Sequence, residues 1–456
     1  MTGTVEAYGA EPPGAPGCPA PHRERHPPIM FVRRSAAVLA ATAVIGTAFA
    51  PAALADESPS AAPSQAVPSG LYGTTDPTYD GVWRQSLALL AQDTVDVRPA
   101  AKAVDWLVGQ QCASGAFAAY RPDPAAECGA KTQVDTNSTA AALQALEALD
   151  AKDSVTGAAV KWLKSVQNED GGWGYLPGTP SDTNSTAVVI GALEAADVDP
   201  QDVPSKDDRT PYDALRGLSV PCAEDGGGAF AYQPDKKGRL AANADATAAG
   251  VLGALGEGMA AEPEEGADGD TSKGSRCVAG DSLSIKDAAA NGAGYLADAV
   301  AKDGHLKSAL AGAKDQPDYG NTADAVVALA TSGRTVEAGK SLAWLEKNSA
   351  DWAAQSGPAA YAQLIFAAHA AGTDPRAFGG ADLVKQLGAT GPAASEAGTD
   401  AKSGSTDGNA DNTDNTDKSD KDDTDGGVSA WWIVGVGLVG GIGIGFLISG
   451  RKKKQQ

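Results

Sequence analysis

The stretch "AVKWLKSVQNEDGGWGY", Ala159–Tyr175, and the stretch "SDTNSTAVVIGALEAA", Ser181–Ala196, together decide the fold. The first stretch indicates an amphipathic helix that ends in a Gly-rich loop. The second indicates an Ala-rich helix that begins with small polar residues, which are favoured at helix starts. Because the same pair recurs along the chain, the repeating unit is a hairpin of two helices.

Four copies of each half are present. In the first half a Gly follows an anchoring Leu by eight residues each time: Leu107, Leu163, Leu218 and Leu296 precede Gly115, Gly171, Gly226 and Gly304. An aromatic residue comes soon after the Gly in three copies: Phe117, Trp173 and Phe230. The second half carries a Thr-Ala step, at Thr139-Ala140, Thr186-Ala187, Thr247-Ala248 and Thr322-Ala323. Two copies share the letters "DTNSTA", which argues against chance.

Weaker copies extend the series to about twelve helices, or six hairpins. They are "DGVWRQSLALLAQD" at the start, then "AGKSLAWLEKNSADW", "GPAAYAQLIFAAHAAG" and "GADLVKQLGAT". Each hairpin can bury its apolar face only against its neighbours, so the array must stack or close. We predict an all-α fold, an α6/α6 toroid over residues 79–390, with the first and last helices as the closing pair. An aromatic content of only 5% suits closely packed, Ala-rich helices.

The charge balance limits the partners. The 456 residues include 36 Lys and Arg against 58 Asp and Glu, a net charge of −22. A nucleic-acid-binding protein would show a basic face, so this class is excluded.

The N-terminal region predicts export. Residues 30–55 combine Arg33 and Arg34, an apolar run and an Ala-Leu-Ala cleavage pattern at 53–55, which is typical of a signal peptide. Residues 1–29 are an extension rich in Pro, Gly and His. The extension is either not translated, with Met30 as the true start, or a real disordered segment.

The C-terminal region predicts a membrane anchor. Residues 428–449 form a stretch without any charged residue, and this stretch is long enough for one transmembrane helix. The basic tail, 450–456, is expected in the cytoplasm by the positive-inside rule. Residues 391–427 form an acidic tract that predicts a disordered stalk. We therefore predict a single-pass protein of the cell membrane with its main domain outside.

Four cysteines follow the signal peptide, and an even number in an exported chain predicts two disulfides. The sequence allows three connectivities. We favour Cys112 with Cys128 and Cys222 with Cys277, because each pair brackets one loop-rich segment.

The repeats resemble a known superfamily. "WLKSVQNEDGGWG" resembles the repeats of squalene–hopene cyclases, and "SDTNSTAVVIGAL" is similar to the helix that follows them there and in protein prenyltransferases. Cobalamin carriers such as transcobalamin have the same α6/α6 toroid. The resemblance covers about 79–390. It implies that the first helix of each pair lies outside and the second lines the barrel.

This arrangement predicts a ligand site. Six polar residues would then gather at the mouth where the inner helices begin: Asp135, Asn137, Asp182, Asn184, Asp245 and Asn321. The alternative is that each residue only caps its own helix. Both roles can coexist, since a ring of helix N-termini also favours anionic or polar ligand groups.

The motifs argue against the superfamily's enzymes. Its cyclases protonate their substrate with a D-x-D-D-T-A motif, but here Asn184 and Ser185 replace the last two acids, and no other repeat supplies a substitute. Its prenyltransferases need Zn²⁺ held by Asp, Cys and His, yet only His305 and His369 follow the signal and no zinc-site spacing is present. We expect no catalytic residue, no metal and no cofactor.

The predicted function is a membrane-anchored extracellular toroid that binds a small molecule or a surface partner. Capture of a vitamin or nutrient for a membrane transporter is the form that the cobalamin carriers suggest. The alternative is a divergent terpene-cyclase-like or prenyltransferase-like enzyme. A structural or adhesive surface protein is the third hypothesis.

Overall fold

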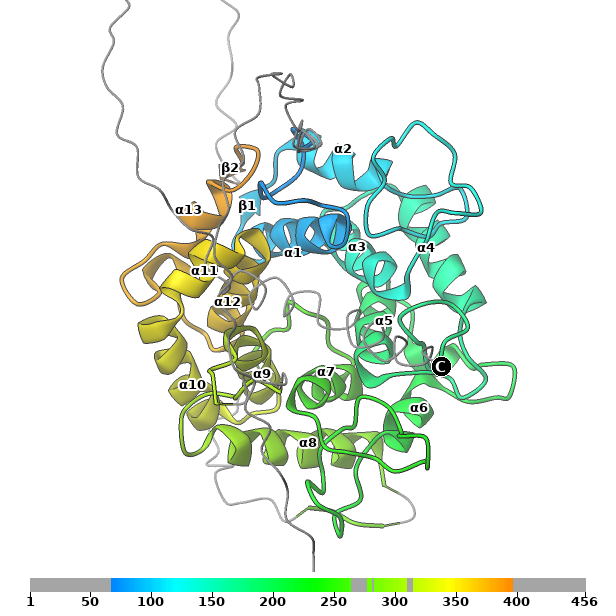
Figure 1. The fold of residues 1–456 in the computed structure, drawn as a ribbon, viewed down its shortest axis with the longest axis vertical. Helices are drawn as coiled ribbons and strands as arrows, with labels where there is room; N and C mark the ends of the chain where they lie inside the picture. Colours follow the sequence, from blue (N-terminus) through cyan, green and yellow to red (C-terminus); the bar gives the residue numbers. More distant parts are fainter. Residues whose placement is uncertain (1–66, 264–276, 281–282, 310–314, 397–456) are drawn as a thin grey trace, which may run out of the picture. The chain divides into compact units, whose positions relative to one another are not determined.

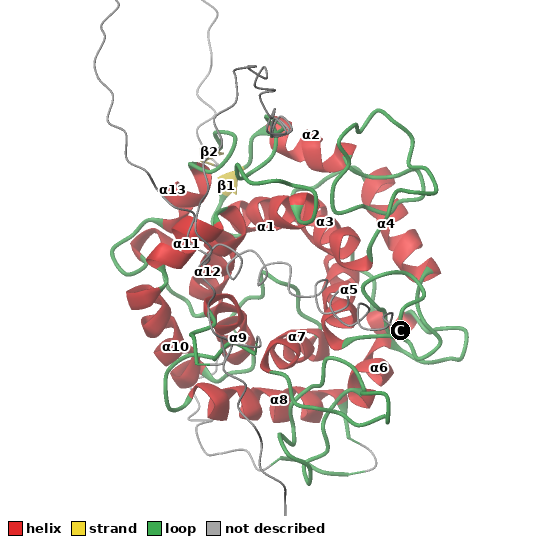
Figure 2. Ribbon diagram, in the orientation of Figure 1, coloured by secondary structure: helices red, strands yellow, loops and turns green. Residues whose placement is uncertain are grey.

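The computed structural model describes residues 67–263, 277–280, 283–309 and 315–396. Within these ranges the chain forms thirteen α-helices, two 3-10 helices (Pro200–Asp202 and Pro375–Ala377) and one sheet of two short strands. Figure 2 shows helices joined by long loops, with almost no strand. The predicted all-α class is confirmed for this part of the chain.

Six helices form a closed inner ring (Figure 1). Each packs against the next in the ring, and the last packs against the first. In ring order they are α1 (Gly81–Asp93), α3 (Thr136–Ala148), α5 (Thr183–Ala195), α7 (Ala244–Leu255), α9 (Tyr319–Thr331) and α12 (Pro358–Ala370). The closed double ring confirms the predicted toroid.

The remaining helices lie outside this ring. Each packs on at least one inner helix. They are α2 (Ala101–Gly109), α4 (Asp153–Ser165), α6 (Pro211–Gly217), α8 (Ile285–Val300), α10 (Thr335–Asn348), α11 (Ala350–Ser356) and α13 (Leu383–Gly388). The second helix of each sequence repeat is therefore the inner one, as the resemblance implied.

Burial explains why the two sets separate. In α3 every residue from Thr136 to Leu146 is buried, as expected for a helix that is surrounded on all sides. In α4 only Thr156, Ala159, Trp162 and Leu163 are buried, which form a single face. The inner helices therefore need small residues, and the outer helices need only one apolar face.

The Thr of the Thr-Ala step fastens each hairpin. Its buried Oγ1 accepts, at 2.9–3.1 Å in all four copies, the backbone N–H of the residue two after a Gly of the loop, which in the third copy is Gly228 rather than Gly226. The same residue's carbonyl oxygen accepts the N–H of the inner helix's N-cap residue, again in all four copies. The Gly allows the turn: Gly171 has a φ of 91°, and a Cβ there would overlap the carbonyl oxygen of Thr210. The repeated letters thus encode one repeated hydrogen-bond motif.

The two ends of the described chain close the ring. The Tyr72 hydroxyl donates to the Pro392 carbonyl oxygen at 3.1 Å. The strand β1 (Val97–Arg98) pairs antiparallel with β2 (Ser395–Glu396). The packed chain therefore begins before residue 79 and continues past residue 390, the bounds predicted for the toroid.

One segment, 256–263, follows the C-terminal end of α7 and contacts three other inner helices; we call it the crossing segment. Its Met259 N–H donates to Gln144 Oε1 of α3 at 3.0 Å, and Gly258 lies against Gly191 of α5. Farther along, Glu262 Oε1 lies 2.8 Å from His369 Nε2 of α12. The crossing segment therefore contacts the C-terminal halves of three inner helices, α3, α5 and α12. The mouth is at the opposite, N-terminal ends of these helices.

Both predicted disulfides are present, Cys112–Cys128 and Cys222–Cys277. The predicted extension, signal peptide, transmembrane span and tail lie outside the described residues, as does the stalk after residue 396. Among the residues that the structure describes, no helix has the length and apolar character to cross a membrane.

Candidate functional site

The six predicted site residues all lie at the mouth, but in different roles. Asp135 and Asp182 are the N-caps of α3 and α5, accepting the N–H groups of Ser138 and Ser185 at 2.6 and 2.7 Å. For these two residues, the capping alternative describes the observed hydrogen bonds. Asn321 donates its Nδ2 to Asp318, the N-cap of α9, at 2.8 Å.

The other three predicted residues stand two positions after a cap and make no capping hydrogen bond. Asn137 belongs to α3, Asn184 to α5 and Asp245 to α7. Asn184 Nδ2 donates to Asp245 Oδ2 at 3.0 Å, so two of the predicted residues meet across neighbouring inner helices.

Asp324 and Gln363, which were not predicted, form a second polar pair on the next two inner helices. On α9, Asp324 accepts hydrogen bonds at both of its carboxylate oxygens, each 3.2 Å from Gln363 Nε2 of α12. Asn184, Asp245, Asp324 and Gln363 therefore lie on four successive helices of the inner ring. We call these four residues the polar arc.

The amide oxygens of the mouth have no hydrogen-bond partner. The Oδ1 atoms of Asn137 and Asn184 and the Oε1 atom of Gln363 are buried and unpaired. Asn137 is only 3% exposed and Asn184 only 7%. Most buried polar atoms in proteins have a partner, so three unpaired amide oxygens at one end of the ring call for an explanation, although other buried atoms of the described chain, such as Gln92 Oε1 and Thr136 Oγ1, are unpaired as well.

The carboxyl groups of Asp245 and Asp324 have raised pKa values and, among the described residues, no neighbouring positive charge to lower them. Burial raises the pKa of Asp245 to about 6, and the nearby Asp318 raises it further. Burial and then the charge of Asp245 raise the pKa of Asp324 to about 7. The hydrogen bond from Asn184 opposes the shift at Asp245, and Gln363 opposes it at Asp324. No Lys or Arg of the described chain is among the groups that shift either pKa.

The pKa values of the two N-cap residues, Asp135 and Asp182, are shifted in the same direction. Burial raises the pKa of Asp135 and of Asp182 to about 6, against the hydrogen bonds from Ser138 and Ser185. Burial, and then the charge of the neighbouring carboxylate, raises the pKa of Tyr175 beside Asp135 and of Tyr232 beside Asp182. The mouth is thus acidic and rich in hydrogen-bond acceptors.

The statement that no other repeat supplies an acid for the cyclase motif was wrong. Asp245 precedes Thr247 by two residues, as Asn184 precedes Thr186, so the next repeat carries an acid at the equivalent position. The sequence could also have indicated that Asp324 is a candidate site residue. It is the single acid in the otherwise apolar run from Thr322 to Ala330.

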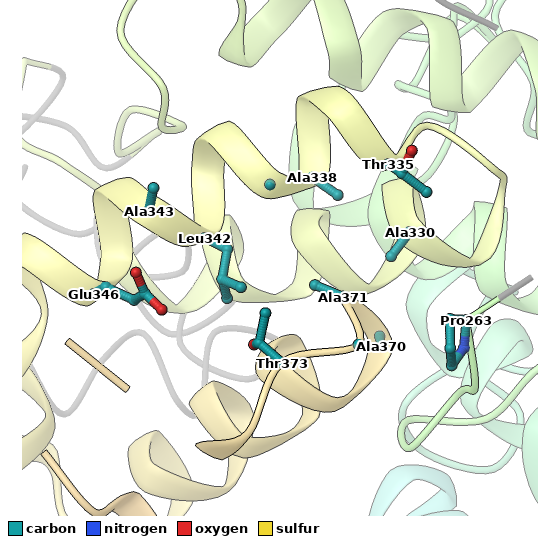
Figure 3. Close-up of a pocket in the computed structure, with 12 residues that line it drawn as sticks. Pro263, Ala330, Thr335, Ala338, Leu342, Ala343, Glu346, Ala370, Ala371 and Thr373 are labelled. Atoms are coloured by element: carbon teal, nitrogen blue, oxygen red, sulfur yellow. The ribbon is translucent and has the colours of Figure 1, made fainter. Parts of the chain in front are cut away.

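A cavity of about 230 Å³ lies elsewhere, between α9, α10 and α12 (Figure 3). Ala330 and Ala370 line it, and both lie at the C-terminal ends of their helices, away from the mouth. Its lining is almost wholly apolar, with Glu346 as its one charged group. It offers no cluster of polar groups that would orient a ligand.

An open groove of about 900 Å³ lies on the outside, beside the loops that follow α4. Three of its polar side chains are bonded to one another. Asn168 Nδ2 donates to Ser181 Oγ at 3.0 Å, and Ser181 donates to Asp170 at 2.7 Å. The mouth, with its unpaired oxygens, is therefore the stronger candidate site.

Within the described ranges, no group of three or more His, Cys, Asp and Glu side chains is arranged to hold a metal ion. His305 stacks on Trp344, with ring centroids 4.2 Å apart, and His369 faces Glu262.

Comparison with known proteins gives structural neighbours only. The chain matches no protein-family model, and no curated protein matches it. A solved protein from Actinoplanes is 15% identical, with a TM-score of 0.43, and the match covers 68% of this chain and 96% of that one. An ent-copalyl diphosphate synthase from Streptomyces platensis is 16% identical, with a TM-score of 0.41, covering 64% of this chain and 50% of that one.

A type II terpene cyclase from Scytonema is 14% identical, with a TM-score of 0.39, and the match covers 61% of this chain and 73% of the cyclase. Terpenoid cyclases are the class whose repeats the sequence resembles. The resemblance is one of fold, and it is confirmed by the closed double ring of helices rather than by these scores.

Proposed function

We propose that this protein binds a small molecule at the mouth of the ring, on the polar arc and Asn137. The observation that carries the proposal is the set of three unpaired amide oxygens, on Asn137, Asn184 and Gln363. A buried acceptor without a partner costs about 1–3 kcal/mol. A bound ligand that donates hydrogen bonds would offset this cost.

The location of these atoms supports the same proposal. They come from α3, α5 and α12, and the acids of the arc come from α7 and α9, so five inner helices contribute. Convergent polar groups from several elements are the usual form of a ligand site. The amide nitrogens of the arc are paired with its carboxylates, whereas the three amide oxygens have no partner.

The place of action follows from the sequence. We propose that the chain is exported, anchored by residues 428–449 and held outside the cell, where it captures its ligand and passes it to a membrane transporter. The two disulfides support an oxidising compartment.

The experiment is native mass spectrometry of the full chain isolated from its own source, with melting temperatures measured in parallel. We expect a bound small molecule on the wild type and none on Asn184→Ala or Asn137→Ala. Without ligand, Asn137→Ala should melt at or above the wild-type temperature, because it removes an unpaired buried oxygen. Asn348→Ala, on the exposed side of α10, is the matched control and should keep the ligand. Lower melting temperatures with the ligand retained would assign both residues a structural role.

A second candidate function is acid catalysis on a terpene-like substrate, the alternative that the sequence resemblance suggests. One feature favours it: Asp245 stands at the equivalent of the cyclase acid position, one repeat later. Because burial raises its pKa to about 6, a fraction of its carboxyl groups stays protonated near neutral pH. A protonated carboxyl group is the form that could donate a proton to an alkene.

Turnover separates the two candidates. Squalene and geranylgeranyl diphosphate are incubated with the wild type, Asp245→Asn and Asn184→Asp, and products are analysed by mass spectrometry. Cyclic products that disappear in Asp245→Asn would establish the enzyme. If no product forms with any variant while the ligand still co-purifies with the wild type, the binding function stands alone.

A further inference from the structure

The polar arc offers acceptors and negative charge but few donors. Each of its two amide nitrogens already donates to a carboxylate, Asn184 Nδ2 to Asp245 and Gln363 Nε2 to both oxygens of Asp324, which leaves at most one N–H of Asn184 for a ligand. What remains for a ligand is therefore mainly the oxygen of each amide and the charge of each carboxylate. A ligand that fits must therefore donate hydrogen bonds, and it is favoured further if it is positively charged.

A missing side chain opens the arc beside an aromatic ring. The position two after the cap carries Asn137, Asn184 and Asp245 in three repeats, but in the fourth it is Gly320. A Cβ built on Gly320 would lie 3.5 Å from Gln363 Oε1 and 3.7 Å from the Trp352 ring. A side chain at 320 would thus fill the space between an unpaired oxygen and an indole.

The Trp352 ring is held in place by its neighbours. It stacks on Tyr319, at 5.6 Å between ring centroids, and Tyr319 stacks on Trp344 at 5.2 Å. An aromatic ring near an amide oxygen, in a site that also holds carboxylates, is a combination that attracts organic cations.

We propose that the polar arc binds an organic cation carrying N–H donors, of the primary amine or guanidine class. The inference rests on the proposed binding function and specifies the chemical class of its ligand. Asp245 with Asn184 Oδ1, and Asp324 with Gln363 Oε1 and Trp352, are the two places where the cation's N–H groups bind. The two carboxylates would be neutralised by the ligand, because no cation of the described protein chain pairs with them.

Other ligand classes fit less well. An anion would meet Asp245, Asp324 and Asp318 without a compensating Lys or Arg. Calcium needs six to eight oxygens at about 2.3–2.6 Å, and in the described ranges no three His, Cys, Asp or Glu side chains are arranged to hold a metal ion. A hydrocarbon would leave the amide oxygens unpaired.

Because the site contains two acids, its affinity for a cation should fall as the pH falls. Burial raises the pKa of Asp245 to about 6 and that of Asp324 to about 7; the charge of Asp318 acts on both acids, and the charge of Asp245 acts on Asp324. Tyr232 also feels the charge of Asp245 and stays neutral, because burial raises its pKa. Both acids lose their charge as the pH falls from 8 to 5, while an aliphatic amine stays protonated.

Isothermal titration of the purified full chain tests the inference. The probes are 1,4-diaminobutane and agmatine, with 1,4-butanediol as the uncharged analogue, tetramethylammonium as a cation without N–H groups, and calcium chloride. We expect binding of at least one of the first two probes at pH 8, weaker by about tenfold or more at pH 5. We expect no binding of the three control probes.

Three variants locate the binding. Asp245→Asn and Asp324→Asn should each weaken it about tenfold or more, the scale of one charge-assisted hydrogen bond. Gly320→Asn removes no charge, and its Cβ would make only ordinary contacts, so it should weaken binding by blocking the space beside Trp352. Gly320→Ala is the milder form if the Asn variant is unstable. Asp105→Asn, on the exposed face of α2, changes the net charge equally and should leave the affinity unchanged.

Several results would overturn the inference. Binding of butanediol or calcium but of neither amine would do so and leave the proposed binding function standing. Amine binding that Gly320→Asn and Asp324→Asn do not change would place it at nonspecific surface acids. If no probe binds while native mass spectrometry shows a bound molecule, the cation class is wrong and the site remains. If no molecule is found by either method, the proposed function falls with it.

Discussion

Thr247→Val tests the hydrogen-bond motif that builds each repeat. Thr247 is fully buried, and its Oγ1 accepts the Phe230 N–H at 3.0 Å and donates to the Asn243 carbonyl oxygen at 2.6 Å. Valine has nearly the same shape but no hydroxyl. The Asn243 carbonyl keeps its bond from the Thr247 N–H at 2.8 Å, so the main loss is the partner of the Phe230 N–H.

The expected loss follows from that one donor. Leaving a buried N–H unpaired costs about 1–3 kcal/mol. Thr247→Ser keeps both hydrogen bonds and removes one methyl group, about 0.8 kcal/mol. We therefore expect Val to be the more destabilising substitution, although it is the more hydrophobic residue and the closer in shape.

Guanidinium unfolding followed by circular dichroism measures both variants against the wild type. The same comparison at Thr139, Thr186 and Thr322 should give the same order, since all four threonines accept the equivalent N–H. A Thr247→Val protein as stable as the wild type would refute the idea that the conserved spacing encodes this hydrogen bond rather than mere packing.

Two further predictions rest on the structure and a third on the sequence. Because burial raises the pKa of Asp182 from 3.8 to about 6, its contribution to stability is fully present below pH 4 and is lost as the pH rises through 6, at about 1.4 kcal/mol per pKa unit. Melting curves from pH 4 to 8 should show a smaller loss in Asp182→Asn, which keeps the cap, than in Asp105→Asn; equal slopes would count against it. Mass mapping without reductant should find Cys112–Cys128 and Cys222–Cys277, and removing either bond should lower stability by about 2–4 kcal/mol; free thiols in the exported protein would contradict this. Protease added to intact cells should release a fragment that ends within 391–427, whereas cleavage of the basic tail alone would reverse the predicted orientation.

The ring was predictable because its signals are local. A Leu, a Gly eight residues later and a Thr-Ala step recur in each repeat, and the structure shows that the Gly permits the turn and the Thr fastens it. The disulfides were predictable for the same reason, since Cys112 and Cys128 bracket one such loop. The crossing segment 256–263 has no repeated pattern, and only the closed ring shows what it covers.

The site was predictable only in part. The small polar residues before each Thr-Ala step placed Asn137, Asn184 and Asp245 at one end of the ring. The pairing of Asp324 with Gln363 could not be read in the same way, because the two residues are 39 apart in sequence and meet only when α9 packs on α12. The distinction between caps and unpaired amides likewise depends on hydrogen bonds that spacing alone does not give.

The central claim is that the unpaired oxygens of the mouth receive a ligand. A crystal structure of the full chain purified from its own source tests this most directly. The account predicts density for an organic molecule with donors within hydrogen-bond distance of Asn184 Oδ1 and Gln363 Oε1, beside Asp245 and Asp324. A mouth in which these oxygens bond only ordered water or other side chains of the protein would contradict it.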